Sequence, residues 1–197
     1  MELYLVRHGL TVWNAAGKLQ GNTDIELNEA GREAAGQLGK KLDDLDFDVI
    51  YSSPLIRAYE TACLIRGHKN IPIIRDQRLR ELSFGEKEGV CYTEWNSPES
   101  PYHYFFTEPD KYCPPPKGES LEELCLRTKD FIQTVLEKDW QKFKRVMIVA
   151  HGALNKGIMC YLEGNDKAHF WGKGLQKNCQ ASIFEYDGSK WRKLTDD

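Results

Sequence analysis

Long apolar runs and one-sided charge are both missing from this sequence. The longest wholly aliphatic stretch extends only from Val146 to Ala150, whereas a membrane-spanning helix needs about 20 apolar residues. The 27 basic and 30 acidic residues give a net charge of −3, with no basic stripe of the kind that binds nucleic acid. Met1-Glu2-Leu3 opens directly into an apolar run without a basic leader. We therefore expect a cytoplasmic protein that binds neither a membrane nor a nucleic acid.

The six cysteines are too widely spread to form a recognisable metal site. They stand at positions 63, 91, 113, 125, 160 and 179, and no two of them make a Cys-x-x-Cys pair. Without a secretion signal we expect reduced thiols, and disulfides are the alternative if the protein is exported. The cysteine pattern therefore gives no reason to expect a metal or another cofactor.

Short apolar runs that alternate with helical patterns predict one α/β domain over residues 1–197. Nearly continuous apolar runs are typical of strands covered on both faces, and spaced apolar residues indicate amphipathic helices. The strands are expected at 3–6, 47–51, 71–74, 146–150, 181–186 and 191–194, and the helices at 28–44, 53–65, 120–136 and 152–162, with a loop over 13–27. The expected fold is a three-layer α/β/α sandwich with a mostly parallel central sheet.

Residues 85–118 lack regular periodicity and contain six of the eight prolines. A long segment of this kind inside a compact domain is usually a functional lid or a disordered linker. Its many aromatic side chains argue against disorder. We interpret it as a small folded cap in which Tyr102, Tyr104 and Phe105 influence substrate choice; the alternative is an excursion that serves packing alone.

The ends of three predicted strands carry guanidinium and imidazole groups. One strand ends in Arg7-His8, the next leads to Arg57 in the first turn of a helix, and a third ends in His151-Gly152. Loops after parallel strands gather at one edge of the sheet, where open α/β sheets bind their ligands. If these strands are neighbours, two histidines and two arginines form a cationic crevice that suits a phosphoryl group.

Backbone groups are expected to reinforce this anion site. Helices that start after Pro54 and Gly152 would present N–H donors and positive dipole ends, and Gly9 would let a ligand approach the backbone closely. A metal ion fits poorly, because two histidines beside two arginines repel a cation and no carboxylate pair accompanies them at ligand spacing.

Five motifs occur in an order that resembles the histidine phosphatase superfamily, the phosphoglycerate-mutase-like proteins. They are LVRHGLTVWN, SSPLIRAYETA, LRELSFGEKEG, PKGESLEEL and VAHGALNKG. Five motifs in order are far more specific than any one of them. The segment from Leu82 to Gly89 is similar to the phosphatase side of the family, which includes alpha-ribazole phosphatase-like and broad-specificity members.

The resemblance implies a role for each matching residue. It implies that His8 is the nucleophile and becomes phosphohistidine, and that Glu81 donates a proton to the leaving oxygen and then acts as the base for water. It also implies that Arg7, Arg57 and His151 bind the phosphoryl group and stabilise its transition state. The full implied phosphoryl-binding set is Arg7, Asn14, Gln20, Gly21, Arg57, His151 and Gly152. Phosphoryl transfer depends on positioning and charge neutralisation, and an alkoxide leaving group needs an acid. The expected partner is a small-molecule phosphomonoester, with no cofactor.

Two other functions stay open. A phosphoglycerate mutase would need a pocket that retains a bisphosphate intermediate, and the chain lacks the longer cap insertion and the LNERHYG-like segment of true mutases. A catalytically idle phospho-ligand binding protein is the alternative from another class, although a binder needs no nucleophile with an acid. Taken singly, Arg7, Arg57, His151 and Glu81 could each be structural or solvated. Asn155 is polar where the family often has an apolar residue, which argues against transferring a relative's substrate to this chain.

Overall fold

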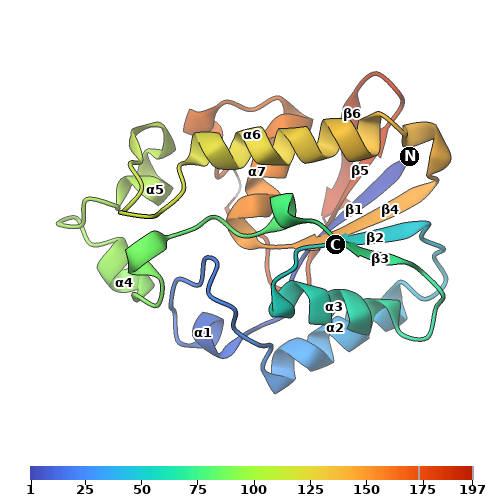
Figure 1. Ribbon diagram of the computed structural model, residues 1–197, viewed down its shortest axis with the longest axis horizontal. Helices are drawn as coiled ribbons and strands as arrows, with labels where there is room; N and C mark the ends of the chain where they lie inside the picture. Colours follow the sequence, from blue (N-terminus) through green and yellow to red (C-terminus); the bar gives the residue numbers. More distant parts are fainter. Residues whose placement is uncertain (173, 197) are drawn as a thin grey trace.

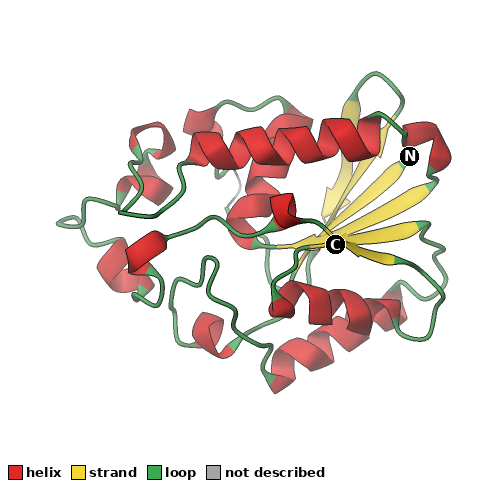
Figure 2. Cartoon of the chain, in the orientation of Figure 1, coloured by secondary structure: helices red, strands yellow, loops and turns green. Residues whose placement is uncertain are grey.

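The computed structural model describes residues 1–172 and 174–196, and it shows one sheet with helices on both faces (Figure 1). The strands, drawn in yellow in Figure 2, are β1 (Glu2–Arg7), β2 (Val49–Ser52), β3 (Ile73–Arg75), β4 (Arg145–Ala150), β5 (Ala181–Tyr186) and β6 (Trp191–Asp196). The α-helices are α1 (Val12–Ala15), α2 (Glu29–Lys41), α3 (Ile56–Arg66), α4 (Tyr92–Trp95), α5 (Tyr104–Thr107), α6 (Leu121–Phe131) and α7 (Gly152–Glu163). Shorter helical segments are η1 (Gln77–Leu79), η2 (Gly85–Lys87), η3 (Pro109–Lys111), the π-helical η4 (Ile132–Glu137), η5 (Trp140–Lys142) and η6 (Lys167–His169). Within the described ranges, no helix combines the length and apolarity needed to cross a membrane.

The strand order is β3-β2-β4-β1-β5-β6, which makes β4 the direct neighbour of both β1 and β2. These strands run parallel, with Arg7 opposite Ala150 and Ser52 opposite Val149. β5 and β6 are antiparallel to their neighbours, as expected for a hairpin turned by Asp187-Gly188. The predicted α/β class and mostly parallel sheet are confirmed, and the polar ends of β1, β2 and β4 meet at one edge.

Alternating side chains of the strands build two separate cores. Leu3 and Leu5 of β1 belong to the cluster that includes α6, α7 and the aromatic residues of 84–112. Tyr4 and Val6 belong to the cluster with α2 and α3. Figure 1 shows these helix pairs on opposite sides of the sheet. The period of two along each strand therefore fixes which residues reach which helical layer.

Helix α3 begins later than the sequence predicted. Its first residue is Ile56 rather than a residue next to Pro54, because Leu55 is extended, with φ −65° and ψ 136°. Ser53 Oγ accepts a hydrogen bond from the Leu55 N–H at 3.3 Å. Asp24 Oδ1 accepts from the Ile56 N–H at 2.7 Å across a sequence separation of 32. A carboxylate from a distant loop thus satisfies a donor that we expected to bind a ligand.

Other boundaries differ by a few residues. Helix α2 ends at Lys41 rather than near Asp44, and Lys69 Nζ donates to the Leu42 carbonyl just beyond it, at 3.3 Å. β3 starts only after Pro72, which has no N–H for the ladder. The Lys69 contact is non-local, so helical periodicity did not reveal it, whereas the Pro72 effect is local.

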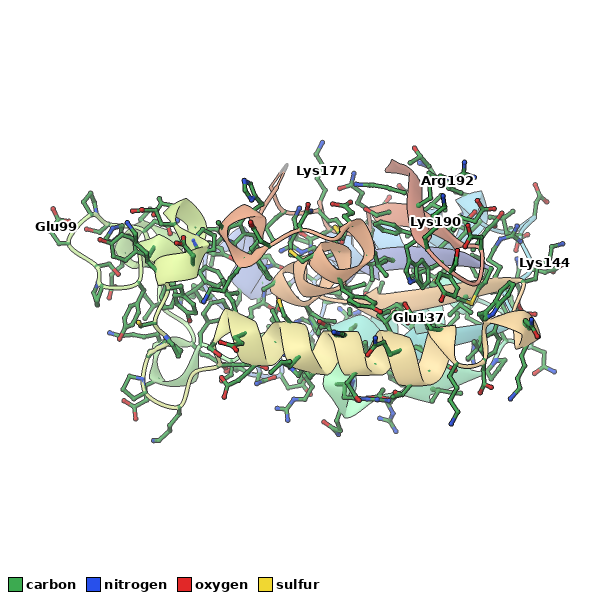
Figure 3. The ribbon with its side chains drawn as sticks, turned by 90° about the horizontal axis from the view of Figure 1, so that it is seen from above. Glu99, Glu137, Lys144, Lys177, Lys190 and Arg192 are labelled. Carbon is green, nitrogen blue, oxygen red and sulfur yellow. The ribbon has the colours of Figure 1, made fainter. Side chains whose placement is uncertain are left out.

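The segment predicted as a cap, residues 85–118, folds around aromatic rings. The Trp95 ring stacks on Tyr102 with centroids 4.7 Å apart, and Phe105 meets Tyr112 at 4.8 Å. Trp95 and Phe105 are both 1% exposed. Figure 3 places this segment at the end of the molecule marked by Glu99, opposite the end marked by Lys144. The aromatic content therefore extends the core that β1 shares with α6 and α7 into this segment.

Candidate active site

The ends of β1 and β4 and the first turn of α3 bring Arg7, His8 and Arg57 into one recess of about 400 Å³, its open mouth included. His151 lies next to His8 but is not part of the described lining of the recess. Arg57 and His151 are fully buried, and His8 is 3% exposed. The rings of His8 and His151 lie 5.1 Å apart between centroids. Arg7, His8, Arg57 and Glu81 all line the recess. The expectation that these strand ends are neighbours is confirmed.

His8 is held in one orientation by its own backbone. Its Nδ1 lies 2.7 Å from the Gly9 carbonyl oxygen, which can only accept, so Nδ1 carries the proton and Nε2 the free electron pair. Burial, followed by the charges of Arg57 and Arg7, lowers the pKa of His8 well below its ordinary value. The Asn178 side-chain amide donates to the His8 carbonyl at 2.9 Å. The imidazole is therefore neutral and oriented, as a nucleophile must be.

The two arginines keep part of their hydrogen-bonding capacity unused. Arg7 Nη1 donates to the Gln176 carbonyl at 2.6 Å. Arg57 donates through Nη2 to Gly21 O at 2.6 Å and through Nη1 to Thr23 O at 2.9 Å. The Nε atoms of both arginines are buried without a partner. Burial lowers the pKa of both, to about 10 for Arg57, so both are charged at neutral pH.

His151 has no hydrogen-bond partner on either ring nitrogen, although it is fully buried. Burial, then the charge of Arg57, lowers its pKa well below the ordinary value. A buried polar group without a partner costs free energy, so unpartnered nitrogens on His151 and on the two arginines of the recess indicate a missing ligand. Two guanidinium groups beside them require that ligand to be an anion. In the described part of the chain, no three His, Cys, Asp or Glu side chains gather in a way that could hold a metal ion.

The Glu81 carboxylate occupies the N-terminus of helix α7. Its Oε1 accepts from Leu154 N and Leu82 N, both at 2.9 Å, and its Oε2 accepts from Ala153 N at 3.2 Å. We expected the α7 N-terminus to serve a bound anion, and this expectation is wrong for these two helix donors. The helix dipole instead holds Glu81 at the edge of the recess.

The other predicted binding residues line the recess but mainly support it. Asn14 completes a capping box with Thr11 on the short helix α1, inside the segment predicted as a loop. Gln20 Oε1 accepts from Thr11 Oγ1 at 2.9 Å. Gly21 has a φ of +55°, and a Cβ there would lie 2.1 Å from Glu88 Oε1. Its carbonyl holds Arg57, so this glycine acts through the arginine.

Glycines at the strand ends allow close packing. A Cβ on Gly9 would lie 2.6 Å from the backbone oxygen of Gly31 in α2, so this glycine permits approach of a helix rather than of a ligand, contrary to our expectation. A Cβ on Gly152 would lie 3.0 Å from Leu175 and 3.6 Å from the guanidinium carbon of Arg7. Gly152 therefore leaves room for Arg7 beside the recess.

Residues near positions 61 and 176 support the site without having been predicted. Thr61 Oγ1 accepts from the Gly9 N–H at 3.0 Å, next to His8. Gln176 Nε2 donates to the Leu5 carbonyl at 3.0 Å, and its Oε1 accepts from Asn155 Nδ2 at 2.8 Å. The unusual polarity of Asn155 was the one visible signal, and this amide pair accounts for it.

One part of the recess lining is apolar. Its aromatic and aliphatic members are Phe84, Tyr92, Phe105, Phe106, Trp171 and Leu175. Of the three cap residues expected to influence substrate choice, only Phe105 lines the recess. Tyr102 instead stacks on Trp95, and the Tyr104 ring lies 4.0 Å from that of His103. The six lining residues are called the apolar wall below.

Comparison with known proteins agrees with this geometry. The model of the histidine phosphatase superfamily (branch 1) matches residues 3–196. Phosphoserine phosphatase 1 of Hydrogenobacter thermophilus is 35% identical over 189 residues, which cover 95% of this chain and 87% of that protein. Phosphoglycerate mutase-like protein 4 of Arabidopsis thaliana is 34% identical over 195 residues, covering 96% and 82%. The solved structure of Bacillus stearothermophilus YhfR superposes with a TM-score of 0.88 at 32% identity and covers 98% of this chain and 94% of that one. The chain belongs to the histidine phosphatase superfamily, as its motifs predicted.

Proposed function

We propose that the protein hydrolyses small phosphomonoesters through a phosphohistidine on His8. The observation that carries this proposal is the neutral His8 ring, whose Nε2 holds the free electron pair in a recess that also contains Arg7 and Arg57. The neutral His151 ring, without a hydrogen-bond partner beside His8, adds one N–H donor for a phosphoryl oxygen. Membership of the superfamily and the phosphoserine phosphatase among the relatives support hydrolysis.

The reaction proceeds in two displacements. In the first, His8 Nε2 attacks phosphorus, the N–P bond forms, the P–O bond to the alcohol breaks, and Glu81 gives its proton to the leaving oxygen. The Nδ1–H bond to Gly9 O disperses the positive charge that develops on the ring. In the second, Glu81 takes a proton from water, the water oxygen bonds to phosphorus, and the N–P bond breaks, which releases phosphate and returns the electron pair to His8 Nε2. Arg7 and Arg57 neutralise charge on the equatorial oxygens in both steps, and His151 donates a hydrogen bond to one of them.

The hydrolase is proposed to work without a metal ion. Its charge-neutralising groups are guanidinium and imidazole, and two arginines beside the phosphoryl site repel a divalent cation. Dialysis against a strong chelator is expected to leave activity on an aryl phosphate unchanged. Loss of activity followed by recovery on adding Mg²⁺, Mn²⁺ or Zn²⁺ would contradict this part of the proposal.

Trapping the phosphoenzyme tests the proposed intermediate directly. Rapid mixing with ³²P-labelled phosphomonoester and a base quench should retain label on the protein, and acid should release it, because phosphohistidine is acid-labile. His8→Ala should lose both the label and the hydrolysis. His169→Ala is the matched control, because the His169 side chain is exposed and its ring pairs with Asp166. Retained activity in His8→Ala would contradict the proposal that His8 is the nucleophile.

A phosphoglycerate mutase is the second candidate, favoured by the mutase-like relative. A mutase needs a recess that keeps a bisphosphate intermediate from water. Incubation with 3-phosphoglycerate, with 2-phosphoglycerate and free phosphate both measured, separates the candidates. We expect phosphate release to exceed interconversion, and the opposite ranking would favour the mutase. A chain that binds phosphate but turns over no ester would instead fit the idle binding protein.

A further inference from the structure

Arg127 on helix α6 uses all of its hydrogen-bond donors near Glu81. A guanidinium has five N–H groups. Two of them go to Glu119, from Nε at 2.5 Å and from Nη2 at 2.8 Å. The others go to backbone carbonyls, of Arg78 at 2.7 Å, of Arg80 at 2.8 Å and of Glu81 at 3.2 Å. Arg127 therefore fixes the backbone that leads into Glu81 and the carbonyl of Glu81 itself.

Glu119 fixes the other side of the same segment. Its Oε2 also accepts from the Ser83 N–H at 3.3 Å, and its own N–H donates to the Ser83 carbonyl at 2.8 Å. The side chains of Arg127 and Glu119 are only 21% and 16% exposed. The ion pair consequently holds the chain before and after Glu81 to one helix. We name this arrangement, Arg127 with Glu119 and the backbone of residues 78–83, the α6 clamp.

We propose that the α6 clamp is the positioning device for the proton transfer by Glu81, an inference that rests on the proposed function. Glu81 sits on a segment without regular structure, between η1 and η2. Its carboxylate lies on the N-terminus of α7, whereas its backbone is tied to α6. Two packed helices thus determine where the carboxyl stands relative to the leaving oxygen. A displacement of about 1 Å can cost a hundredfold in rate.

The predicted signature is a loss that depends on the leaving group. In Arg127→Lys the charge remains, but an ammonium has three donors and cannot reproduce the planar fork. We expect the pre-steady-state burst with an alkyl phosphate to slow by about tenfold to a hundredfold. With an aryl phosphate, whose phenolate leaves without a proton, the burst should change less than threefold. When Arg127→Lys is combined with Glu81→Gln, the burst rate with the alkyl phosphate should be no lower than in Glu81→Gln alone.

Lys129→Ala is the matched control on the same helix. Lys129 lies two positions beyond Arg127 and places its Nζ over the Tyr161 ring, 5.8 Å from the centroid, outside the α6 clamp. It should leave both bursts unchanged. Glu119→Gln, which keeps the shape of the carboxylate, should show the alkyl-selective loss in milder form and serves if Arg127→Lys does not fold.

Equal losses on alkyl and aryl phosphates in the folded clamp variants, or a further loss in the Glu81→Gln background, would overturn the inference and leave the clamp a structural feature. The proposed function would survive that result. If instead Glu81→Gln itself shows no difference between the substrates, Glu81 is not the acid and both the proton-transfer role and the inference fail.

Discussion

The two ends of the recess are built from different kinds of structure. At the inner end, His8, Arg57 and His151 stand at the ends of parallel strands or in the first turn of a helix, and all three are buried. The apolar wall comes from aromatic residues of the segment 84–106, which has only short helices, and from Trp171 and Leu175. The inner end carries charge, whereas the apolar wall carries aromatic surface.

This difference separates reaction from substrate choice. In the proposed function, the strand ends hold the groups that bind the phosphoryl group, which is common to all phosphomonoesters. The apolar wall is then left for the alcohol part, which differs between substrates. Apart from Arg7 and Arg57, no lysine or arginine belongs to the described lining of the recess. The predictions below test whether the two ends act separately.

The largest effect is expected at the inner end. Arg57→Ala removes the charge that we propose stabilises the transferring phosphoryl group, and loss of such a group costs about 10²–10³-fold in turnover. All phosphomonoesters should be affected alike, because the contact involves only the common group. Steady-state assays with one aryl and two alkyl phosphates measure this. Arg75→Ala, which alters an exposed arginine over the Tyr59 ring, should leave turnover unchanged. A substrate-dependent loss in Arg57→Ala would break the proposed separation.

Glu81 is the proposed acid for the leaving oxygen, so the effect of replacing it should depend on the leaving group. Glu81→Gln cannot deliver a proton and should slow the alkyl phosphate burst by about 10²-fold. The aryl phosphate burst should suffer much less, although later hydrolysis of phosphohistidine should slow because water has lost its base. Glu86→Gln is the control, since that exposed carboxylate pairs with Lys117. Equal burst losses on both substrates would mean that Glu81 only positions the phosphate.

A smaller, substrate-selective effect is expected from a substitution in the apolar wall. Phe106→Ala removes apolar surface from the wall, which is worth about 10-fold for a substrate that contacts it. Bulky aryl and alkyl phosphates should lose kcat/KM relative to the smallest phosphomonoester in a panel. Tyr104→Phe is the control, because Tyr104 lies in the same helix α5 but does not line the recess. If all substrates fall equally, the wall is structural only.

Local patterns were sufficient for the inner end of the recess. The apolar run before Arg7-His8 and the run before His151 predicted buried strands, and the strand-end rule then predicted that their side chains meet. β4 does lie between β1 and β2. The chemistry at these positions is encoded within a few residues of each strand end. This is why the family and the sheet could both be predicted from the sequence.

Non-local contacts explain what the sequence did not reveal. Asp24 caps helix α3 from another loop, and Glu81 rather than a ligand takes the first donors of α7. Trp171 reaches the wall from a segment without periodicity, where its indole N–H donates to the Phe105 carbonyl. Tyr102 was expected at the substrate because of its place in the cap, yet packing on Trp95 directs it elsewhere. Such partners are chosen by the tertiary fold.

The smallest predicted effect concerns the stability of the inner end against acid. His8 and His151 have folded-state pKa values held well below the ordinary one by burial, then by nearby arginine charge. The unfolded chain therefore takes up protons first as the pH falls below about 6.5. The free energy of unfolding should decrease from there downward, by up to about 1.4 kcal/mol per pH unit for each imidazole.

Urea unfolding between pH 7.5 and 5.5 in phosphate-free buffer measures this loss. Carboxylates with a lowered pKa, such as Asp76, also lose their contribution to stability in acid, but only from about pH 4 downward. The chosen pH window lies above that range. His151→Asn removes one buried imidazole and should flatten the decline, whereas His169→Asn, at an exposed site, should not. Identical slopes in the wild type and His151→Asn would mean that the buried ring is not held neutral.

Inorganic phosphate should stabilise the wild type more than His151→Asn, because bound anion supplies the partner that the buried nitrogens lack. Both the loss of stability in acid and the stabilisation by phosphate would then come from the same group, the buried His151 ring without a hydrogen-bond partner.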